Sequence, residues 1–171
     1  MTALTEGELE KYMNICISLA RETPREIKKP YVGSLVLSKE KDIVGAGNKS
    51  FLDNTSYIIH AERNAIIHSG DLARGGTLFT TLEPCVKVRN SQVLKSCAEL
   101  IVDSGVETVV MAIEDSSPSI HRGSGLIYLR ESNLEVILYD RLNHTQQDLI
   151  SHWHFKDYKT WISLGREEMP T

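Results

Sequence analysis

The 171-residue chain has little cysteine, proline or aromatic content and no long apolar run. Its three cysteines are odd in number and widely spread, which argues against a disulfide framework and favours metal-binding or packing roles. No apolar stretch approaches the roughly 20 residues that span a bilayer, so we expect no membrane partner. Because the first residues have neither the basic start nor the apolar stretch of a signal peptide, we expect a cytoplasmic protein.

Composition and net charge further limit the classes of protein to which the chain could belong. With 41% hydrophobic and 25% charged residues, the composition is that of an ordinary globular chain, and its length allows a substantial core. No internal repeat, low-complexity tract or linker divides the sequence. The formal net charge of −4 at pH 7 disfavours a broad nucleic-acid-binding surface and leaves room only for a local basic groove.

Hydrophobic periodicity in the first half of the chain predicts a helix, a hairpin and a second helix. Thr5-Glu6-Gly7-Glu8 has the spacing of a capping box and opens an amphipathic helix. Strands are expected over residues 31–37 and 43–46, on either side of a polar turn. The second helix is expected over residues 59–69, with Gly70 as its C-terminal stop.

Strands and helices alternate in the second half. We expect strands over 77–81, 108–113 and 136–139, and helices over 97–104 and 126–131. The capping-box spacing of Ser96 and Glu99 places Cys97 in the first turn of its helix. The order β-β-α-β-α-β-α-β behind an N-terminal helix predicts an α/β fold, a three-layer α/β/α sandwich.

The C-terminal region reads as one more helix, over about residues 145–164, with an apolar and aromatic face. We therefore predict a main domain over residues 1–143 and a helical extension over residues 144–171. The extension would pack on the same domain or on a partner subunit.

The most specific pattern in the chain is His60-Ala61-Glu62 followed by Pro84-Cys85. Histidine and cysteine ligate zinc, and three protein ligands with one open position let a catalytic zinc bind and acidify water. The sequence H-x-E…P-C-x-x-C is the signature of zinc-dependent nucleobase deaminases. Its first half is intact here, whereas the next cysteine after Cys85 is Cys97. The competing thiol, Cys16, lies on the apolar face of the first helix, where a free cysteine is usually a core residue.

Two of these residues are expected at helix starts. The N-termini of helices carry unsatisfied N–H groups and partial positive charge, which favour thiolates. His60 and Cys97 would therefore hold the metal between two rigid elements. Glu62 is the candidate catalytic residue, facing the open position and moving a proton from the bound water to a leaving amine.

Residues from about Met13 to Asp140 resemble the cytidine deaminase-like superfamily, most closely the pyrimidine deaminase domain of riboflavin biosynthesis. The likeness rests on Lys29-Pro30-Tyr31-Val32-Gly33, Ile43-Val44-Gly45-Ala46-Gly47, His60-Ala61-Glu62-Arg63-Asn64-Ala65, Thr81-Leu82-Glu83-Pro84-Cys85 and the segment from Asp115 to Gly125. The resemblance implies that His60, Cys85 and Cys97 hold Zn²⁺ and that Glu62 shuttles the proton. It also implies a five-stranded mixed sheet between helices, and assembly as a homodimer or homotetramer.

The chain departs from the riboflavin enzymes at substrate-reading positions. Lys29 stands where they have asparagine, and Lys49 stands where they usually have histidine. The spacer 86–96 is three residues longer than theirs. Candidate substrate-binding residues are Asn48, Lys49, Ala61, Glu83, Lys87 and Arg89.

These candidates have different expected roles. By resemblance, the backbone carbonyl of Glu83, or that of Leu82, receives the amine. Lys49, Lys87 and Arg89 are candidates for a phosphate contact, the alternative being that they are simply solvated. Because the spacer is tethered at both ends by proposed ligands and contains no acidic residue, we expect it to form a positive rim that selects an anionic substrate.

The sequence therefore predicts a zinc-dependent hydrolytic deaminase that removes an exocyclic amine from a pyrimidine or purine-like base, nucleoside or nucleotide. One alternative is deamination of a base in single-stranded RNA or DNA, which requires a basic path with exposed aromatic residues. A second alternative is a non-catalytic, zinc-stabilised partner subunit. Such a protein would be expected to lose Glu62, which is present.

Overall fold

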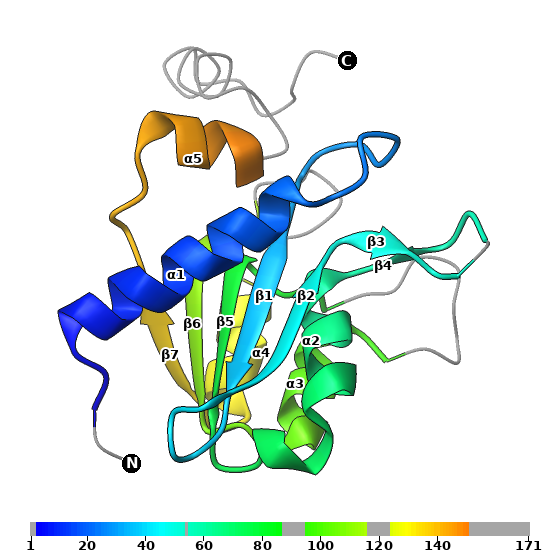
Figure 1. Cartoon of the computed structure of the whole chain (residues 1–171). Coiled ribbons are helices and arrows are strands. Elements are labelled where there is room, and N and C mark those ends of the chain that lie inside the picture. Colours follow the sequence, from blue (N-terminus) through cyan, green and yellow to red (C-terminus); the bar gives the residue numbers. More distant parts are fainter. Residues whose placement is uncertain (1–2, 54, 87–94, 116–123, 151–171) are drawn as a thin grey trace.

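A five-stranded mixed sheet runs through the middle of the molecule in a computed structural model that describes residues 3–53, 55–86, 95–115 and 124–150 (Figure 1). Its strands are β1 (Gly33–Leu37), β2 (Ile43–Asn48), β5 (Thr77–Leu82), β6 (Thr108–Ile113) and β7 (Glu135–Leu138). They lie in the order β2-β1-β5-β6-β7. β1 is antiparallel to β2 and β5, whereas β5, β6 and β7 are parallel. The predicted five-stranded mixed sheet is confirmed.

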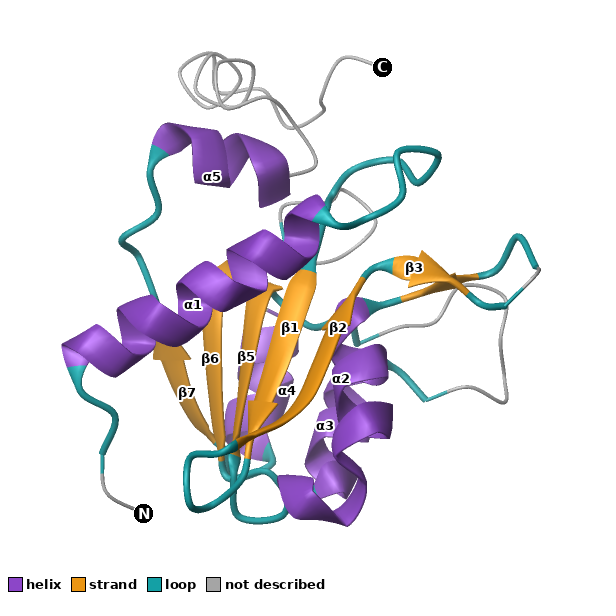
Figure 2. Cartoon of the chain, in the orientation of Figure 1, coloured by secondary structure: helices purple, strands orange, loops and turns teal. Residues whose placement is uncertain are grey.

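Helices cover both faces of this sheet (Figures 1 and 2). They are α1 (Glu6–Arg21), α2 (Ala61–Ser69), α3 (Cys97–Ser104), α4 (Ser124–Glu131) and α5 (His144–Ile150). α1 lies across one face with α5 beside it, and α2, α3 and α4 lie on the other. This arrangement is the predicted three-layer sandwich. No helix among the described residues is long and apolar enough to cross a membrane.

The core consists of two layers because side chains alternate along the central strands. Leu35 of β1 and Phe79 of β5 belong to the layer beneath α1. Their neighbours Val36 and Leu78 belong to the layer beneath α2, α3 and α4. Both strands are buried on both faces, including the threonines of β5, as is typical of strands covered by helices on each side.

Two glycines allow α2 to lie directly on β2. A Cβ atom at Gly45 would lie 2.2 Å from the carbonyl oxygen of Ala65, and one at Gly47 would lie 2.6 Å from that of Ala61. Any side chain at either position would push the helix away from the strand. The Gly-Ala-Gly sequence therefore sets the depth at which α2, and the residues at its start, sit against the sheet.

Local signals placed most helix ends correctly. The capping boxes of α1 and α3 are both formed, and Gly105 closes α3 in the left-handed conformation with φ of 76°. The predicted start of α2 was wrong, because Ile59 belongs to a two-stranded ribbon of β3 (Ser50–Phe51) and β4 (Ile58–Ile59). Beyond Gly70 the chain continues as a 3₁₀ helix, η1 (Gly70–Ala73).

The described part of the C-terminal extension packs on the main domain. Leu149 accepts a backbone hydrogen bond from Tyr31, and Ile150 is fully buried in the layer beneath α1. The rest of the helix expected over 145–164 lies outside the described residues. The division into residues 1–143 and 144–171 stays a prediction.

Candidate metal centre

Three chain segments bring one histidine and two cysteines together. His60 is the N-cap of α2, directly after β4, and its side chain makes no capping hydrogen bond. Cys85 follows the end of β5, and Cys97 is the first residue of α3. Their ligand atoms lie within 4.8 Å of one another, and this is the one metal-ligating group of its kind in the described part of the chain. Cys16 is instead buried in the apolar layer beneath α1.

The distances within this group fit tetrahedral zinc. His60 Nδ1 lies 3.6 Å from Cys85 Sγ and 3.5 Å from Cys97 Sγ. With zinc–nitrogen bonds of about 2.05 Å and zinc–sulfur bonds of about 2.3 Å, the nitrogen–sulfur edge of a tetrahedron is about 3.6 Å. One imidazole and two thiolates are also a donor set that zinc prefers, and they leave its fourth position open.

Their mutual contact moves the pKa values of the two cysteines in opposite directions. The Cys97 thiol, the His60 ring and the Cys97 backbone N–H all stabilise the Cys85 thiolate and lower the pKa of Cys85 to about 4. The Cys97 backbone N–H lies 3.5 Å from Cys85 Sγ. The pKa of Cys97 is raised because its thiol donates to that thiolate. Zinc would take the place of this proton, since metal ligands must be deprotonated.

Glu62 provides a carboxyl group beside the proposed ligands. It lies in the first turn of α2 and is only 3% exposed. Burial raises the pKa of Glu62 to about 7, although the neighbouring His60 acts in the opposite direction. A carboxyl group in this environment can accept or donate a proton near neutral pH. Zinc at the adjacent ligands would stabilise its ionised form through positive charge.

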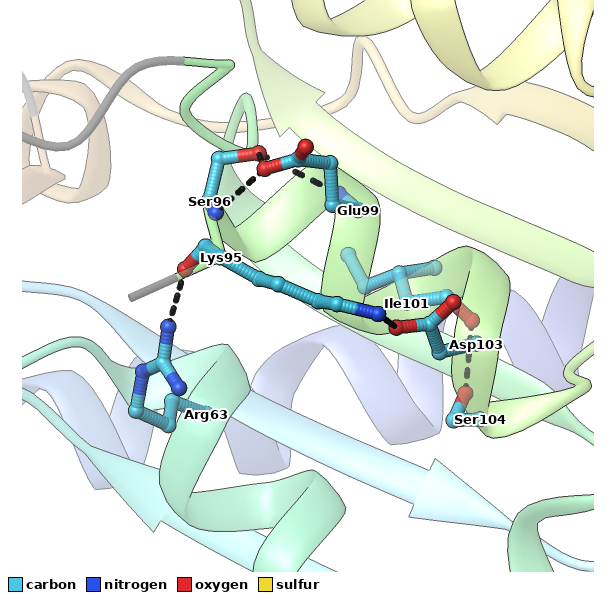
Figure 3. A network of polar contacts seen from close by, with 7 residues as sticks. All are labelled: Arg63, Lys95, Ser96, Glu99, Ile101, Asp103 and Ser104. Atoms are coloured by element: carbon cyan, nitrogen blue, oxygen red, sulfur yellow. Dashed lines mark hydrogen bonds and ion pairs between the residues drawn. The ribbon is translucent and has the colours of Figure 1, made fainter. Parts of the chain in front are cut away.

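A polar network ties the two helix starts to each other (Figure 3). The Arg63 guanidinium of α2 donates to the backbone carbonyl of Lys95, one residue before the N-cap of α3. Ser96 and Glu99 form the capping box that starts α3. This network fixes the segment carrying His60 against the segment carrying Cys97. Arg63 belongs to the His-Ala-Glu-Arg-Asn-Ala motif, but its role in this network could not be recognised from the sequence, because its partner is a backbone carbonyl.

One of the three basic residues in the predicted positive rim, Lys95, already pairs with an acidic residue of the protein. The Lys95 ammonium forms an ion pair with Asp103 of α3, so its charge is compensated within the protein (Figure 3). Lys87 and Arg89 lie outside the described residues. The expectation that the spacer selects an anionic substrate therefore stays a prediction that depends on these two side chains.

Two of the other candidate substrate residues, Asn48 and Lys49, lie at the end of β2 and directly after it. Asn48 ends β2, and its carbonyl accepts a hydrogen bond of 2.9 Å from the Asn64 side chain. The Lys49 ammonium donates to the carbonyls of Lys28 and Pro30, at 2.9 and 3.1 Å. Burial lowers the pKa of Lys49, and the charge of Glu62 partly opposes this effect.

The candidate residues Ala61 and Glu83 are both buried, in different surroundings. Ala61 is fully buried at the first position of α2, against β2. The Glu83 side chain is also buried, and it accepts backbone hydrogen bonds from residues after β6 and at the start of α4. The sequence indicated only a role for the Glu83 backbone carbonyl, as a contact for the substrate amine. That carbonyl role stays a prediction.

Comparison with known proteins agrees with this site. A family model described as the cytidine and deoxycytidylate deaminase zinc-binding region matches residues 6–113, which include all three proposed ligands and Glu62. The chain belongs to this family of zinc-binding deaminases.

Curated relatives of similar sequence come from bacterial riboflavin biosynthesis. The riboflavin biosynthesis protein RibD of Bacillus amyloliquefaciens is 39% identical over 128 residues, which cover 74% of this chain and 32% of that protein. The diaminohydroxyphosphoribosylamino-pyrimidine deaminase of Buchnera aphidicola is 34% identical over 108 residues, covering 63% and 67%. The chain thus spans about a third of the RibD protein that it matches.

Solved structures show the same fold. A diaminohydroxyphosphoribosylaminopyrimidine deaminase/5-amino-6-(5-phosphoribosylamino)uracil reductase from Thermotoga maritima matches with a TM-score of 0.66 and 28% identity. That match covers 92% of this chain and 42% of the other. The Rib2 deaminase of Aspergillus oryzae, at 17% identity, matches with a TM-score of 0.70 over 92% of this chain and 98% of its own, a likeness of fold alone.

Proposed function

We propose that the chain is a hydrolytic deaminase that replaces the exocyclic amine of an aminopyrimidine with oxygen and releases ammonia. The observation that carries this proposal is the group of His60, Cys85 and Cys97 with the buried carboxyl group of Glu62 beside it. The proposed reaction is the hydrolysis of a carbon–nitrogen bond in a cyclic amidine.

The protein's own residues account for the proton movements of such a reaction. Zinc bound to the three ligands would supply an acidified water at its open position, with a pKa lowered from 15.7 to about 7. Glu62 would accept a proton from that water and pass it to a ring nitrogen. The water oxygen would bond to the ring carbon that carries the amine. Glu62 would then carry the second proton of that oxygen to the amine, and the carbon–nitrogen bond would break to release ammonia and leave a carbonyl group. Burial of Glu62 keeps the carboxyl group dry and correctly oriented for both transfers.

Support for an aminopyrimidine comes from the relatives, whose names describe a phosphoribosylated aminopyrimidine as substrate. Lys49 adds a positive charge close enough to lower the pKa of His60, and the charge of Glu62 in turn opposes the lowering of the pKa of Lys49 by burial. We propose that the substrate is anionic, a nucleotide or a phosphoribosylated pyrimidine, with Lys49 near its acceptor groups. Lys87 and Arg89 are the proposed phosphate contacts.

A paired substrate screen tests both parts of the proposal. Ammonia release would be measured for aminopyrimidine and aminopurine compounds, each as free base, nucleoside and nucleotide. We expect release from an aminopyrimidine, with the phosphorylated form preferred. Release from none of these compounds by zinc-loaded protein would overturn the proposed function, and equal turnover of phosphorylated and unphosphorylated forms would overturn the anionic preference.

The spacer is tested by changing Lys87 and Arg89 together to alanine. KM for the phosphorylated substrate should rise while the zinc content stays the same, and the difference should shrink as salt is added. Lys95→Ala is the matched control, because Asp103 already compensates that ammonium. An unchanged KM in the double variant would leave the spacer without a role in substrate choice.

We further propose that the protein forms a homo-oligomer, in which the β3–β4 ribbon is covered. A two-stranded ribbon is marginally stable in water by itself, yet this one exposes Phe51, Leu52, Tyr57 and Ile58. Tyr57 is 75% exposed, and the ribbon leads directly to His60. Light scattering of wild type and Tyr57→Lys tests the proposal: we expect a smaller particle for the variant, and a monomeric wild type would refute it.

A further inference from the structure

Glu83 is a buried charge between the proposed metal ligand Cys85 and the core. It directly follows β5, two residues before Cys85, and is 3% exposed. A carboxylate is costly to bury unless hydrogen bonds compensate for the lost water. The partners of Glu83 therefore show what the carboxylate holds in place.

Within the described parts of the chain, three backbone N–H groups from two distant segments donate to this carboxylate. Oε2 accepts a hydrogen bond of 2.8 Å from Asp115, which follows β6. Oε1 accepts one of 2.6 Å from Gly125 and one of 3.2 Å from Leu126, both in the first turn of α4. First-turn N–H groups have no partner within their own helix, and the positive end of the helix favours a negative charge there. The carboxylate thus joins β5, the end of β6 and the start of α4.

The start of α4 also touches the backbone next to Glu83. A Cβ atom at Gly125 would lie 2.2 Å from the carbonyl oxygen of Pro84, so the helix contacts the residue between Glu83 and Cys85. On the other side of the turn, the N–H of Ala98 donates to the Cys85 carbonyl at 3.0 Å. The turn from Glu83 to Cys85 is therefore held between the first turns of α4 and α3.

We propose that Glu83 is a positioning residue for the metal centre, which acts through Cys85. Its carboxylate anchors the turn to α4, and this anchor sets where Cys85 Sγ stands relative to His60 Nδ1 and Cys97 Sγ. The proposal rests on the metal centre of the proposed function. It differs from the expected role of Glu83 as a substrate contact, because it assigns the carboxylate to backbone N–H groups after β6 and at the start of α4.

Glu83→Gln is the direct test, since it keeps the shape but replaces one acceptor oxygen with an NH₂ group that faces an N–H donor. Zinc affinity would be measured by chelator competition, and coordination geometry by the visible spectrum of the Co²⁺-substituted protein. We expect zinc affinity to fall about 10- to 100-fold, as is typical when the groups that orient a ligand are changed. The Co²⁺ bands should shift, because the Cys85 sulfur has moved.

Glu8→Gln is the matched control, because Glu8 is also a carboxylate that accepts a backbone N–H at a helix start. It accepts the Thr5 N–H in the capping box of α1, an element that carries none of the proposed metal ligands. It should lower thermal stability and leave the Co²⁺ spectrum unchanged. Gly125→Ala is the second variant: its Cβ would lie 2.2 Å from the Pro84 carbonyl oxygen and 2.9 Å from Glu83 Cγ, so it disturbs the same anchor while the carboxylate itself is kept. It should shift the spectrum in the same direction as Glu83→Gln.

The outcomes separate this inference from the proposed function. A wild-type protein that binds neither Zn²⁺ nor Co²⁺ would remove the metal centre itself. If Glu83→Gln folds and has the same Co²⁺ spectrum and zinc affinity as the wild type, only the positioning role is overturned. If Glu83→Gln does not fold, the spectrum of Gly125→Ala decides, and failure of both variants to fold would assign Glu83 to the stability of the fold instead.

Discussion

Changing Glu62 to glutamine should stabilise the metal-free protein at neutral pH. In the zinc-loaded protein the same change should remove most of the activity. Burial raises the pKa of Glu62 from 4.5 to about 7, so the folded state binds this proton more tightly than the unfolded chain does. A tenfold change in proton affinity is worth about 1.4 kcal/mol, so ionising this carboxyl group costs the folded metal-free protein about 3 kcal/mol at pH 8. Glutamine stays neutral and avoids that cost.

The sign of the pH dependence identifies the cause. Below pH 4.5 the carboxyl group is protonated in both states, and between pH 4.5 and about 7 the wild type should lose stability relative to the variant. Urea unfolding of reduced, chelator-treated protein from pH 3 to 8 measures this difference and also covers part of the range in which the control below should respond. A constant packing difference between the two side chains cancels, because only the slope with pH is compared.

Glu8→Gln provides an internal control of opposite sign. Hydrogen bonding to Lys41 lowers the pKa of Glu8 to about 2, so the wild-type residue stabilises the fold above pH 4.5, and this contribution is lost as the pH falls toward 2. In the zinc-loaded enzyme, Glu62→Gln should reduce turnover by about 10²- to 10⁴-fold with zinc retained. Parallel stability curves for wild type and Glu62→Gln between pH 4 and 8 would refute the reasoning.

Three further changes test the metal site and the fold. Cys97→Ser should reduce zinc from about one ion per chain to a small fraction in metal analysis, and full retention would exclude Cys97 as a ligand. Phe79→Ala should lower the free energy of unfolding, measured in urea, by about 3–5 kcal/mol. Leu138→Ala, at a position that is 45% exposed, should have a much smaller effect. Equal losses in the two variants would contradict the assignment of the core. Gly47→Ala should cost about 1–3 kcal/mol, because its Cβ would lie 2.6 Å from the Ala61 carbonyl oxygen, and an unchanged melting temperature would argue against this close approach.

Elements with strong local signals could be predicted from the sequence almost residue by residue. β6 has the predicted bounds of 108–113, because a buried apolar run between polar residues is a local signal. α3 begins at its capping box and ends at Gly105 for the same reason. The β3–β4 ribbon was missed because strands of two residues are too short for any period to be visible. The start of α2 was misplaced because its N-cap, His60, is not a usual capping residue.

The candidate site shows the same limit. The grouping of His60, Cys85 and Cys97 could be expected from residue types and spacing, because metal chemistry admits few side chains. The side-chain role of Glu83 could not, since its partners are backbone N–H groups 32 to 43 residues further along the chain. The same holds for Lys49, whose ammonium is held by two carbonyls. Backbone donors and acceptors carry no signature in a sequence.

The separation of the three metal ligands along the chain has a consequence for how freely this family can change its loops. An ion bound to them closes one loop of 25 residues and another of 12. The entropy of closing a flexible loop grows only with the logarithm of its length, so the three extra residues expected in the second loop would weaken ion binding by only about 0.3 kcal/mol. The spacer can therefore be lengthened and rewritten at almost no thermodynamic cost to the metal, provided that Cys85 and the start of α3 keep their places. Substrate preference and metal affinity can thus evolve as separate traits of one short stretch of chain.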